Sequence, residues 1–264
     1  LGKATPEDFA RAIMTTDAFH KISHREVSLP GGVVKLVGMA KGAGMICPNM
    51  ATMLSVVLCD AQVEASVWQK MLRDAVELTF NRVTVDGDTS TNDTLYGLAN
   101  GASGVSASGE ESLKALSAAL TSVLGDLAYM LVKDGEGASK VARIHVTGAA
   151  SDADAERVAR TVGHSQLVKT ALYGRDANWG RIVAAVGRSG ADFNPDDVVV
   201  TLCGVELFRK GQPTDLDFDA LLEEPLKQRD LPIDIVLGSG SGSYTLLASD
   251  LGHEYVNVNA DYRS

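Results

Sequence analysis

The stretch Lys41-Gly-Ala-Gly-Met-Ile-Cys-Pro-Asn-Met-Ala-Thr-Met-Leu54 decides how the rest of the chain is interpreted. Its glycines, Gly42 and Gly44, can adopt backbone conformations that are closed to other residues. The apolar run that follows predicts a buried strand over residues 55–59, so the loop brings the hydroxyl of Thr52 to the start of a strand. An ordinary strand-entry loop explains this pattern, and so does an N-terminal nucleophile. If the chain is cut before Thr52, its new α-amino group, with a pKa of about 7.7–8.0, can act as the base for the hydroxyl.

Composition bounds the class of protein. The 264 residues are 45% hydrophobic and 22% charged, which is typical of a globular chain with one large domain or two small ones. A net charge of −10 argues against nucleic acid and anionic membrane as partners, since both require a basic surface. We see neither a membrane-spanning run nor a signal peptide, and therefore expect a cytoplasmic protein. Three cysteines without metal-site spacing, Cys47, Cys59 and Cys203, predict reduced thiols. Because the chain opens at Leu1 without a methionine, we interpret it as a fragment or a processed product.

Helices and strands are predicted to alternate irregularly along the chain. Expected helices cover residues 6–14, 65–81, 112–131 (after a capping box at Ser108–Glu111), 152–161, 165–171, 179–187 and 216–227. Expected strands cover 24–29, 33–39, 55–59, 83–85, 141–146, 197–203, 233–237, 243–249 and 254–259, and Gly238–Gly242 is expected to be a tight turn. Without a strict βαβ repeat, this mixture predicts an α+β fold in which helices cover stacked β-sheets.

Two sequence patterns resemble metal sites, but each lacks residues that such a site requires. The acidic run Asp86–Asp93 resembles a calcium loop, but Thr91 stands where glycine is required and Gly97 where a bidentate glutamate is required. A loop held by Asx and Ser/Thr turns is the better interpretation. His20 and His24 have helical spacing, but no glutamate is placed as in a metalloprotease, and they lead into an expected strand. No metal site is predicted.

Four segments in the same order resemble the ornithine acetyltransferase family, also called glutamate N-acetyltransferases. They are Lys41–Leu54, Phe80-Asn-Arg-Val-Thr-Val-Asp-Gly-Asp-Thr-Ser-Thr-Asn-Asp-Thr94, Gly174-Arg-Asp-Ala-Asn-Trp-Gly-Arg181 and Tyr255-Val-Asn-Val-Asn-Ala-Asp-Tyr-Arg-Ser264. The resemblance implies an αββα-like layered architecture. It also implies that the segment at 80–94 lines or braces the site and that the segment at 174–181 is a fold-critical turn near it.

The resemblance implies a mechanism. Family members cut themselves before a threonine, here at the Ala51–Thr52 bond. Residues 1–51 would then be the C-terminal part of an α subunit and residues 52–264 the β subunit, with one shared core and further assembly into a higher oligomer. Thr52 would carry an acetyl group from N2-acetyl-ornithine to glutamate by a ping-pong reaction in arginine biosynthesis, without a coenzyme or metal.

The resemblance also implies substrate-binding residues. Lys41 matches a lysine that holds a carboxylate, and Glu136, in Asp134-Gly-Glu-Gly137, matches a glutamate that pairs with the ornithine ammonium. Asn259 and the terminal Ser264 match residues that close over the site. Thr16 is the expected substrate-contacting threonine upstream, with Thr15 as the competing choice.

This sequence departs from the family pattern in three places. The long N-terminal portion that carries the family's Thr-Gly oxyanion pair is absent from these 264 residues. Ser264 stands where many relatives end in threonine, and Cys47 stands where alanine is common. The two substitutions leave open a paralogue that serves a secondary-metabolite pathway such as clavulanic acid production. Two rival functions also remain: a threonine-nucleophile amidase or aminopeptidase, and a non-catalytic amino-acid-binding domain of the same fold.

Overall fold

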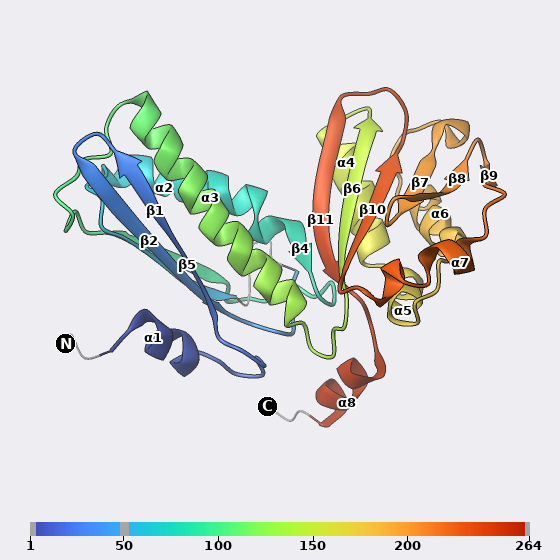
Figure 1. Cartoon of the computed structure of the whole chain (residues 1–264), viewed down its shortest axis with the longest axis horizontal. Helices are drawn as coiled ribbons and strands as arrows, with labels where there is room; N and C mark the ends of the chain where they lie inside the picture. The colour runs from blue at the N-terminus through green and yellow to red at the C-terminus, as the bar shows by residue number, and fades with distance from the viewer. Residues whose placement is uncertain (1–3, 48–52, 262–264) are drawn as a thin grey trace. The chain divides into compact units, whose positions relative to one another are not determined.

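The computed structural model describes residues 4–47 and 53–261. It consists of two compact units (Figure 1). The first unit contains Leu1–Val83 and Gly87–Gly135, and the second contains Thr84–Asp86 and Glu136–Ser264. Each unit is a mixed β-sheet with helices packed on it. The predicted α+β class, with helices covering β-sheets, is therefore confirmed.

The first unit is built on a four-stranded sheet with the order β1-β2-β3-β5. β1, β2 and β3 pair in antiparallel fashion, and β3 pairs with β5 in parallel. The strands are β1 (Lys21–Leu29), β2 (Gly32–Lys41), β3 (Leu54–Cys59) and β5 (Thr94–Ala99). The helices are α1 (Pro6–Ala12), α2 (Ala65–Leu78), the short 3-10 helix η1 (Phe80–Arg82) and α3 (Glu110–Lys133).

The long helix α3 supplies the core of this unit. It lies across β1 and β2 (Figure 1) and buries one side completely. Five leucines that recur at helical spacing have no exposed surface: Leu116, Leu120, Leu124, Leu127 and Leu131. By length and by a mean hydropathy of 1.6, α3 is apolar enough to cross a membrane, but its burial on the sheet is that of a core helix.

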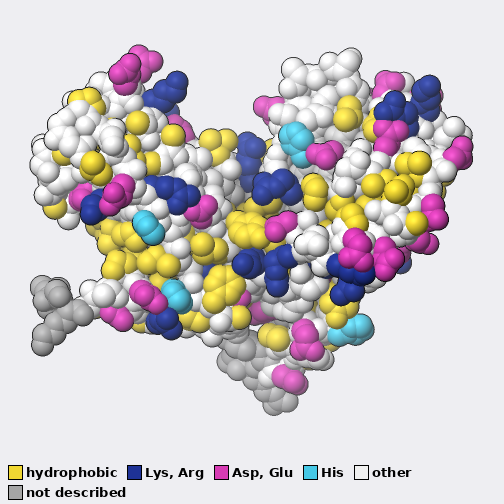
Figure 2. All heavy atoms as spheres, in the orientation of Figure 1, with side chains coloured by type: hydrophobic (Ala, Val, Ile, Leu, Met, Phe, Trp, Pro, Cys, Tyr) yellow, Lys and Arg dark blue, Asp and Glu magenta, His cyan; other side chains and the backbone are white. Residues whose placement is uncertain are grey.

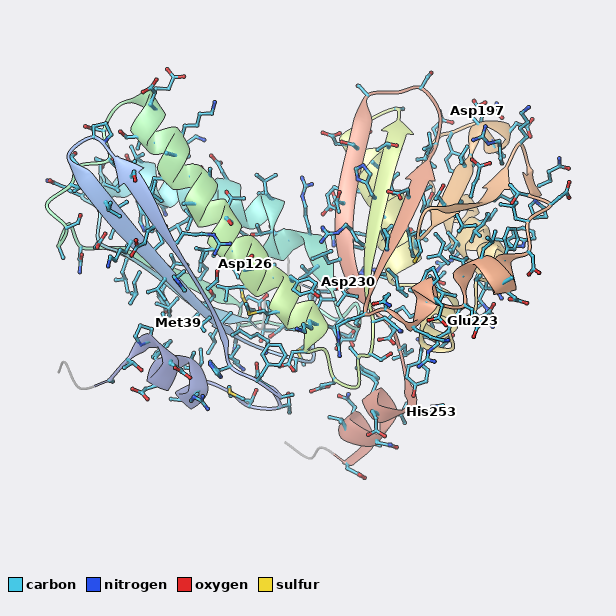
Figure 3. The ribbon with its side chains drawn as sticks, viewed as in Figure 1. Met39, Asp126, Asp197, Glu223, Asp230 and His253 are labelled. Carbon is cyan, nitrogen blue, oxygen red and sulfur yellow. The ribbon has the colours of Figure 1, made fainter. Side chains whose placement is uncertain are left out.

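The polar side of α3 is tied to the sheet by Asp126, which is marked in Figure 3. Its carboxylate accepts hydrogen bonds from Ser23 Oγ and from Arg25 Nη2, both at 2.6 Å. Ser23 and Arg25 alternate with outward-facing residues on β1, so both reach the helix from the covered face of the sheet. This contact fixes the helix along the length of the strand.

The second unit is built on a sheet of seven strands in the order β4-β11-β6-β10-β7-β8-β9. The strands are β4 (Val83–Thr84), β6 (Val141–Ala149), β7 (Val199–Leu202), β8 (Val205–Arg209), β9 (Gln212–Pro213), β10 (Asp230–Val236) and β11 (Gly242–Ser249). The α-helices are α4 (Asp152–Gly163), α5 (Gln166–Tyr173), α6 (Trp179–Gly187), α7 (Phe218–Leu222) and α8 (His253–Asp261). Two 3-10 helices complete it: η2 (Pro195–Asp197) and η3 (Pro225–Lys227).

Helix α4 covers the centre of this second sheet. It packs on β6 and β11, where Val158 and Val162 meet Ile144 and Leu246 in a fully buried cluster. Gly163 allows this close approach, because a Cβ there would lie 2.6 Å from a methyl carbon of Leu246. On the surface, acidic and basic side chains are interspersed on the visible face of each unit (Figure 2).

Four local predictions were wrong. Residues 254–259, predicted as a strand, lie in helix α8, where side-chain amides bond within one turn and no side chain is buried. The helix predicted over 216–227 ends at Leu222, and only a short 3-10 helix follows from Pro225. The predicted capping box at Ser108–Glu111 is absent: α3 begins after Gly109, whose φ is +82°, without a side-chain cap. The loop at Gly238–Gly242 is no tight turn, since it crosses from β10 to β11 past the intervening strand β6.

Candidate functional site

The loop that leaves β2 begins with a constrained glycine. Gly42 has a φ of +139°, and its backbone N–H donates to Asp17 Oδ1 at 2.7 Å. Beyond it, Ala43, Ile46 and Cys47 are buried, so this part of the loop is held by packing as well. The predicted role of glycine is thus confirmed at Gly42, where a side chain would meet Ile46.

The predicted cleavage pair, Ala51 and Thr52, lies outside the described residues. The next residue, Met53, is 1% exposed and is held at both ends of its peptide unit. Its N–H donates to Asp93 Oδ1, and its carbonyl accepts from Thr94 N at 2.8 Å. Asp93 and Thr94 end the acidic segment that was expected to line or brace the site. In the structure, this segment anchors the residue that directly follows Thr52.

Lys41 lies beside the start of β3. In the β2–β3 ladder it is paired with Leu54, two residues after Thr52. One step along the ladder, Ser55 Oγ donates to the Met39 carbonyl at 2.9 Å and adds a side-chain bond to the backbone pairing. Lys41 and the strand that follows the predicted nucleophile are therefore neighbours in one sheet.

A buried ion cluster supports this end of the first unit. The ammonium of Lys21, with no exposed surface, lies 2.6 Å from Asp17 Oδ1 and 2.5 Å from Asp134 Oδ2. Asp17 also accepts from Gly42 N and, at 3.1 Å, from Thr15 N. The cluster of Asp17, Lys21 and Asp134 thus fixes both the start of the Lys41–Leu54 loop and the loop that carries the predicted threonine.

The two carboxylates of this cluster differ in their titration. Burial raises the pKa of Asp17, but hydrogen bonds from Gly42 N, Lys21 and Thr15 N together hold it below its ordinary value. Burial also raises the pKa of Asp134, and there the Lys21 hydrogen bond and charge offset the rise only in part. Asp17 is therefore the stable counter-ion of Lys21, and Asp134 is the carboxyl that first takes up a proton.

The upstream threonines lie next to this cluster. Thr15 and Thr16 are both exposed in the loop between α1 and β1, directly before the buried Asp17. Only the backbone of Thr15 has a described bond to Asp17, and both hydroxyls remain available to a ligand by exposure. The choice between Thr15 and Thr16 stays a prediction.

Two other predicted site residues meet in the second unit. Asn259 Nδ2 donates to Glu136 Oε2 at 2.8 Å and to the Tyr255 carbonyl at 2.9 Å. Gly137 lies directly under helix α8, since a Cβ there would lie 2.6 Å from Tyr255 N, and its φ is +69°. Helix α8 therefore packs directly against the backbone at Glu136 and Gly137. The last predicted residue, Ser264, lies outside the described residues.

The acidic segment is also fixed where it begins. In the second unit, buried Lys169 donates from Nζ to the carbonyls of Val85 and Ser249, the first at 2.7 Å, and to Ser249 Oγ at 3.1 Å. Burial lowers the pKa of Lys169 to about 8. Asp86, which follows Val85 in the chain, accepts a hydrogen bond from Tyr255 Oη at 3.4 Å. The carbonyl of Val85 and the carboxylate of Asp86 thus hold the start of the segment in the second unit.

The segment Gly174–Arg181 forms a helix start in the second unit. Asn178 caps α6 by accepting from Arg181 N at 3.1 Å and donates to Asp176 Oδ2 at 2.9 Å. Trp179 stacks on Phe208 with ring centroids 5.7 Å apart. These contacts stabilise the start of helix α6, so the segment has a clear role in the fold of the second unit.

The cysteines and histidines give no separate reactive centre among the described residues. Cys47, Cys59 and Cys203 are free thiols, and burial raises the pKa of Cys59 and of Cys203. Within residues 4–47 and 53–261, no three His, Cys, Asp or Glu side chains are grouped to hold a metal ion.

Sequence reasoning missed the Asp17–Lys21–Asp134 cluster and the anchoring of Met53 by Asp93. Lys21 and Asp134 are 113 positions apart, and Met53 and Asp93 are 40 apart. No local pattern connects them. The only usable signal was the spacing of four between Asp17 and Lys21, which has no meaning outside a helix.

Comparison with known proteins identifies relatives along the whole chain. The model of the ArgJ family matches residues 1–264. The "Arginine biosynthesis bifunctional protein ArgJ" of Nitratidesulfovibrio vulgaris is 74% identical over 264 residues, which are 100% of this chain and 67% of that protein. The proteins of the same name from Desulfotalea psychrophila and Chlorobium chlorochromatii are each 48% identical, over 98% and 96% of this chain. The chain spans 66% and 59% of their lengths.

A solved structure extends this comparison to the fold. A crystal structure of "Arginine biosynthesis bifunctional protein argJ" from Bacillus halodurans superposes with a TM-score of 0.76 at 37% identity. The match covers 80% of this chain and 100% of that chain. It confirms the predicted α+β layered fold class.

Proposed function

Because the chain belongs to the ArgJ family, we propose that it carries the nucleophile of a self-cleaving glutamate N-acetyltransferase of arginine biosynthesis. The reaction moves an acetyl group from N2-acetyl-ornithine to glutamate through Thr52. The predicted family resemblance is confirmed by the match over residues 1–264. The activity, substrates and partners of the whole protein are proposals, since this chain spans only 66% and 59% of the length of two of these relatives.

The first step in this proposal is the cut before Thr52. The hydroxyl oxygen of Thr52 attacks the Ala51 carbonyl and displaces the Thr52 nitrogen, which forms an ester and a free amine. Water then opens the ester, so Ala51 leaves as a carboxylate and the Thr52 hydroxyl is restored. Residues 1–51 and 52–264 become two chains. The antiparallel β2–β3 ladder, from Leu36–Cys59 to Lys41–Leu54, holds the two chains together after the cut.

One comparison supports two chains. Thr52 to Ser264 is 213 of the 264 residues, or about four-fifths. The solved chain from Bacillus halodurans matches 80% of this chain over its own full length. A chain of that size is what a cut at Ala51–Thr52 leaves.

Acetyl transfer then follows in two steps. Thr52 Oγ1 attacks the acetyl carbonyl of N2-acetyl-ornithine, its proton passes through the Thr52 α-amine to the leaving nitrogen, and ornithine departs. The glutamate amine then attacks the acetyl ester, the threonine oxygen leaves, and the α-amine takes a proton from the attacking glutamate nitrogen and passes it to that oxygen. An α-amine with a pKa of about 7.7–8.0 is suited to both transfers near neutral pH.

Substrate recognition is assigned to the residues that the resemblance identifies. Lys41 binds a substrate carboxylate as a point charge, and Thr16 contacts the substrate beside it. Glu136 pairs with the side-chain ammonium of ornithine, and Asn259 orients Glu136 through their 2.8 Å hydrogen bond. Ser264 closes the site. The oxyanion donors are assigned to the part of the longer relatives that lies outside these 264 residues.

The observation that carries this proposal is the fixed position of Met53. Its N–H and carbonyl are held by Asp93 and Thr94, and its strand runs beside Lys41. A nucleophile must be held against its target within a few tenths of an ångström, and an anchored neighbour supports such positioning for Thr52.

The test is the intact mass and N-terminal sequence of every chain in the purified gene product. We expect a chain that starts at Thr52, its loss in Thr52→Ala, and its slower appearance in Thr52→Ser. Acetyl transfer is then assayed with and without glutamate. If acetate is released at the same rate with and without glutamate, the protein is an amidase instead. If the uncut chain is active, the mechanism with Thr52 as an N-terminal nucleophile is wrong. Unchanged function in Thr52→Ala would indicate a non-catalytic binding domain.

Cellular location and assembly complete the proposal. We place the enzyme in the cytoplasm, where amino-acid acetylation for arginine synthesis would draw on soluble substrates. The α and β chains from one precursor form at least one αβ unit and assemble further. Fractionation of cells and the mass of the native particle test these two statements.

A further inference from the structure

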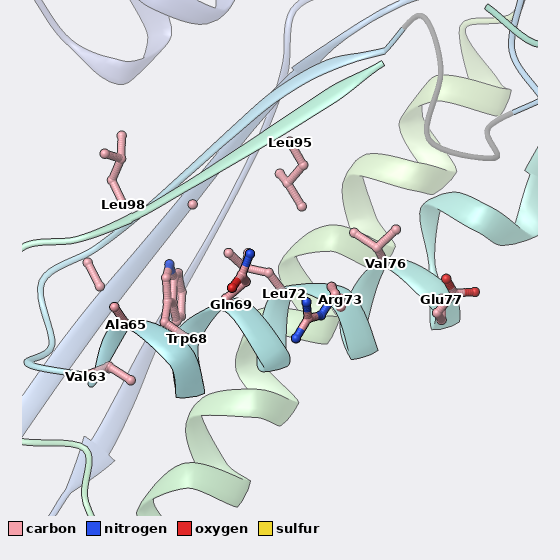
Figure 4. A pocket seen from close by; sticks show the side chains of 12 residues that line it. Val63, Ala65, Trp68, Gln69, Leu72, Arg73, Val76, Glu77, Leu95 and Leu98 are labelled. Carbon is pink, nitrogen blue, oxygen red and sulfur yellow. The ribbon is translucent and has the colours of Figure 1, made fainter. Parts of the chain in front are cut away.

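A groove lies between helix α2 and strand β5 in the first unit (Figure 4). Its volume is about 830 Å³. The walls that matter here are formed by Trp68, Leu72 and Val76 of α2 and by Leu95, Gly97 and Ala99 of β5. Arg73 and Glu77 stand at the rim with opposite charges. The groove is therefore largely apolar, without a charge that would select an ionic ligand.

Strand β5 is an edge strand of its sheet, and its residues line this groove. Within the described residues its sheet neighbour is β3 alone. Thr94 N and Asn100 N donate to carbonyls on the β3 side, and backbone groups alternate in direction along a strand. The N–H groups of Leu95, Gly97 and Ala99 therefore point away from β3. An edge strand of this kind is a template for pairing with another strand.

Trp68 supplies an independent observation. Its side chain is 5% exposed, and its Nε1 is buried without a hydrogen-bond partner among the described residues. The indole N–H can only donate, and leaving it unpaired costs about 1–3 kcal/mol. The Trp68 nitrogen lies directly over the backbone of β5, since a Cβ on Gly97 would be 2.9 Å from it. A buried donor thus lies over Gly97, in the middle of the edge strand.

The far face of β5 is also incompletely covered. Tyr96 and Leu98 are 63% and 56% exposed, and Leu54 and Leu58 on the neighbouring strand are 41% and 37% exposed. These side chains share one face of the sheet because they alternate with the residues that face α2. Exposed apolar surface beside an open edge is typical of an interaction surface.

We propose that this groove receives an extended polypeptide segment that adds to β5 as a further strand. Its carbonyls accept from the free N–H groups of Leu95, Gly97 and Ala99, and one acceptor on it pairs with Trp68 Nε1. Its apolar side chains fill the space against Leu72. The segment comes from the part of the longer relatives that these 264 residues do not match. This part is one-third of the Nitratidesulfovibrio vulgaris protein and 41% of the Chlorobium chlorochromatii protein.

The choice of a polypeptide over a small molecule follows from the free edge. Three outward N–H groups, spaced two residues apart, match the carbonyls of one extended strand. The lining residues also follow β5 along its length, from Leu95 to Leu98 in Figure 4. The proposal is independent of acetyl transfer, since it concerns what completes the sheet.

The experiment uses the 264-residue chain and, as the probe, the polypeptide of the Nitratidesulfovibrio vulgaris relative outside the matched region. The two are co-expressed as separate chains, with a tag on the probe. We expect co-purification and at least a ten-fold slowing of amide hydrogen exchange over residues 94–99. The indole N–H resonance of Trp68 should shift and exchange more slowly, while that of Trp179 in the second unit stays unchanged.

Two variants and one matched control test whether the probe binds at β5. Trp68→Phe retains the ring and removes the donor, so we expect it to weaken probe binding roughly three- to ten-fold, the value of one hydrogen bond. Trp179→Phe is the matched control and should leave binding unchanged. Ala99→Pro removes one outward N–H and places a ring on the open edge, so it should reduce capture further without touching the bonds to β3.

Three outcomes would overturn the proposal. A captured probe that leaves exchange over residues 94–99 unchanged binds elsewhere. Protection of these amides in the 264-residue chain alone, together with a dimer mass, identifies a second copy as the occupant. The third outcome comes from the intact relative, in which no separate probe has to fold. Fast exchange in its strand equivalent to β5 would show that no strand is added there.

Discussion

Replacement of Lys21 by methionine should be strongly destabilising. The side chains of Lys21 and Asp17 have no exposed surface, and that of Asp134 has 3%. Methionine fills much of the same space but leaves both carboxylates without their cation. Loss of one partner from a buried ion pair costs about 3–5 kcal/mol, and we expect the free energy of unfolding to fall by that amount at pH 8.

The loss should depend on pH in a definite direction. In Lys21→Met, Asp17 keeps the donors Gly42 N and Thr15 N, so Asp134 is the group that protonates in the native state. The native variant then binds a proton that the unfolded chain does not, and its stability rises as pH falls. The deficit against wild type should narrow between pH 8 and pH 5, by at most about 1.4 kcal/mol per pH unit.

Urea unfolding followed by circular dichroism at several pH values measures both effects. The matched control is Lys35→Met, because Lys35 forms an exposed pair with Glu26 at 3.3 Å and should cost at most about 1 kcal/mol. The double variant Lys21→Met, Asp134→Leu should recover part of the loss, since it removes the carboxyl that requires protonation. A Lys21→Met deficit as small as that of Lys35→Met, or one that does not vary with pH, would refute the reasoning.

Three further predictions concern the second unit. The pKa of Lys169 is about 8 in the native state and 10.5 in the unfolded chain. Above pH 8 the unfolded chain therefore retains a proton that the native chain releases. In urea titrations, the free energy of unfolding relative to Lys169→Met should rise by about 2 kcal/mol between pH 7 and pH 9.5. Gly137→Ala places a Cβ 2.6 Å from Tyr255 N at a φ of +69°, so helix α8 should detach, seen as faster amide exchange over residues 253–261 with little change elsewhere. Asn259→Ala removes an exposed contact to Glu136, so the unfolding midpoint should stay constant while KM for N2-acetyl-ornithine rises several-fold; an unchanged KM would remove Asn259 from substrate recognition.

Local chemistry in the sequence predicted much of the fold. The start of the first helix at Pro6, which Thr5 caps, and helix α6 over 179–187 agree with the predicted ranges 6–14 and 179–187. These elements depend on contacts within a few residues, which a sequence displays directly. Helix α8 was predicted as a strand because Tyr255-Val-Asn-Val alternates, although none of its residues is buried and the alternation has no sheet to face.

Three strands, β5, β8 and β9, were not predicted from local patterns. β5 contains Gly97, which leaves room for helix α2, because a Cβ there would lie 2.3 Å from Leu72 Cδ1 and 2.9 Å from Trp68 Nε1. β8 follows β7 after a turn at Cys203–Gly204, and the cysteine there adopts a φ of +49° that its residue type does not announce. β5 depends on β3, which is distant in the sequence, whereas β8 pairs with β7 and β9, which lie directly before and after it.

The site residues were predicted from the family resemblance alone. The roles of Lys41, Glu136 and Asn259 stay predictions, and the pairing of Lys41 with Leu54 and of Asn259 with Glu136 was not predicted from the sequence. The Ala51–Thr52 bond and Ser264 lie outside the described residues, and their roles stay predictions. The supporting ion cluster could not be predicted, because its members come together only when α3 lies across β1.

The path of the chain between its two units has a consequence for folding. The chain leaves the first unit at Thr84, returns at Gly87 and leaves again after Gly135. Strand β4 at residues 83–84 must therefore wait for its partner β11 at residues 242–249, more than 150 residues later. Pairing over such a separation is slow, because a long loop must close before the contact forms. During synthesis the first unit can complete its core by residue 135, and the second sheet closes its β4 edge only after β11, at residues 242–249, has been made.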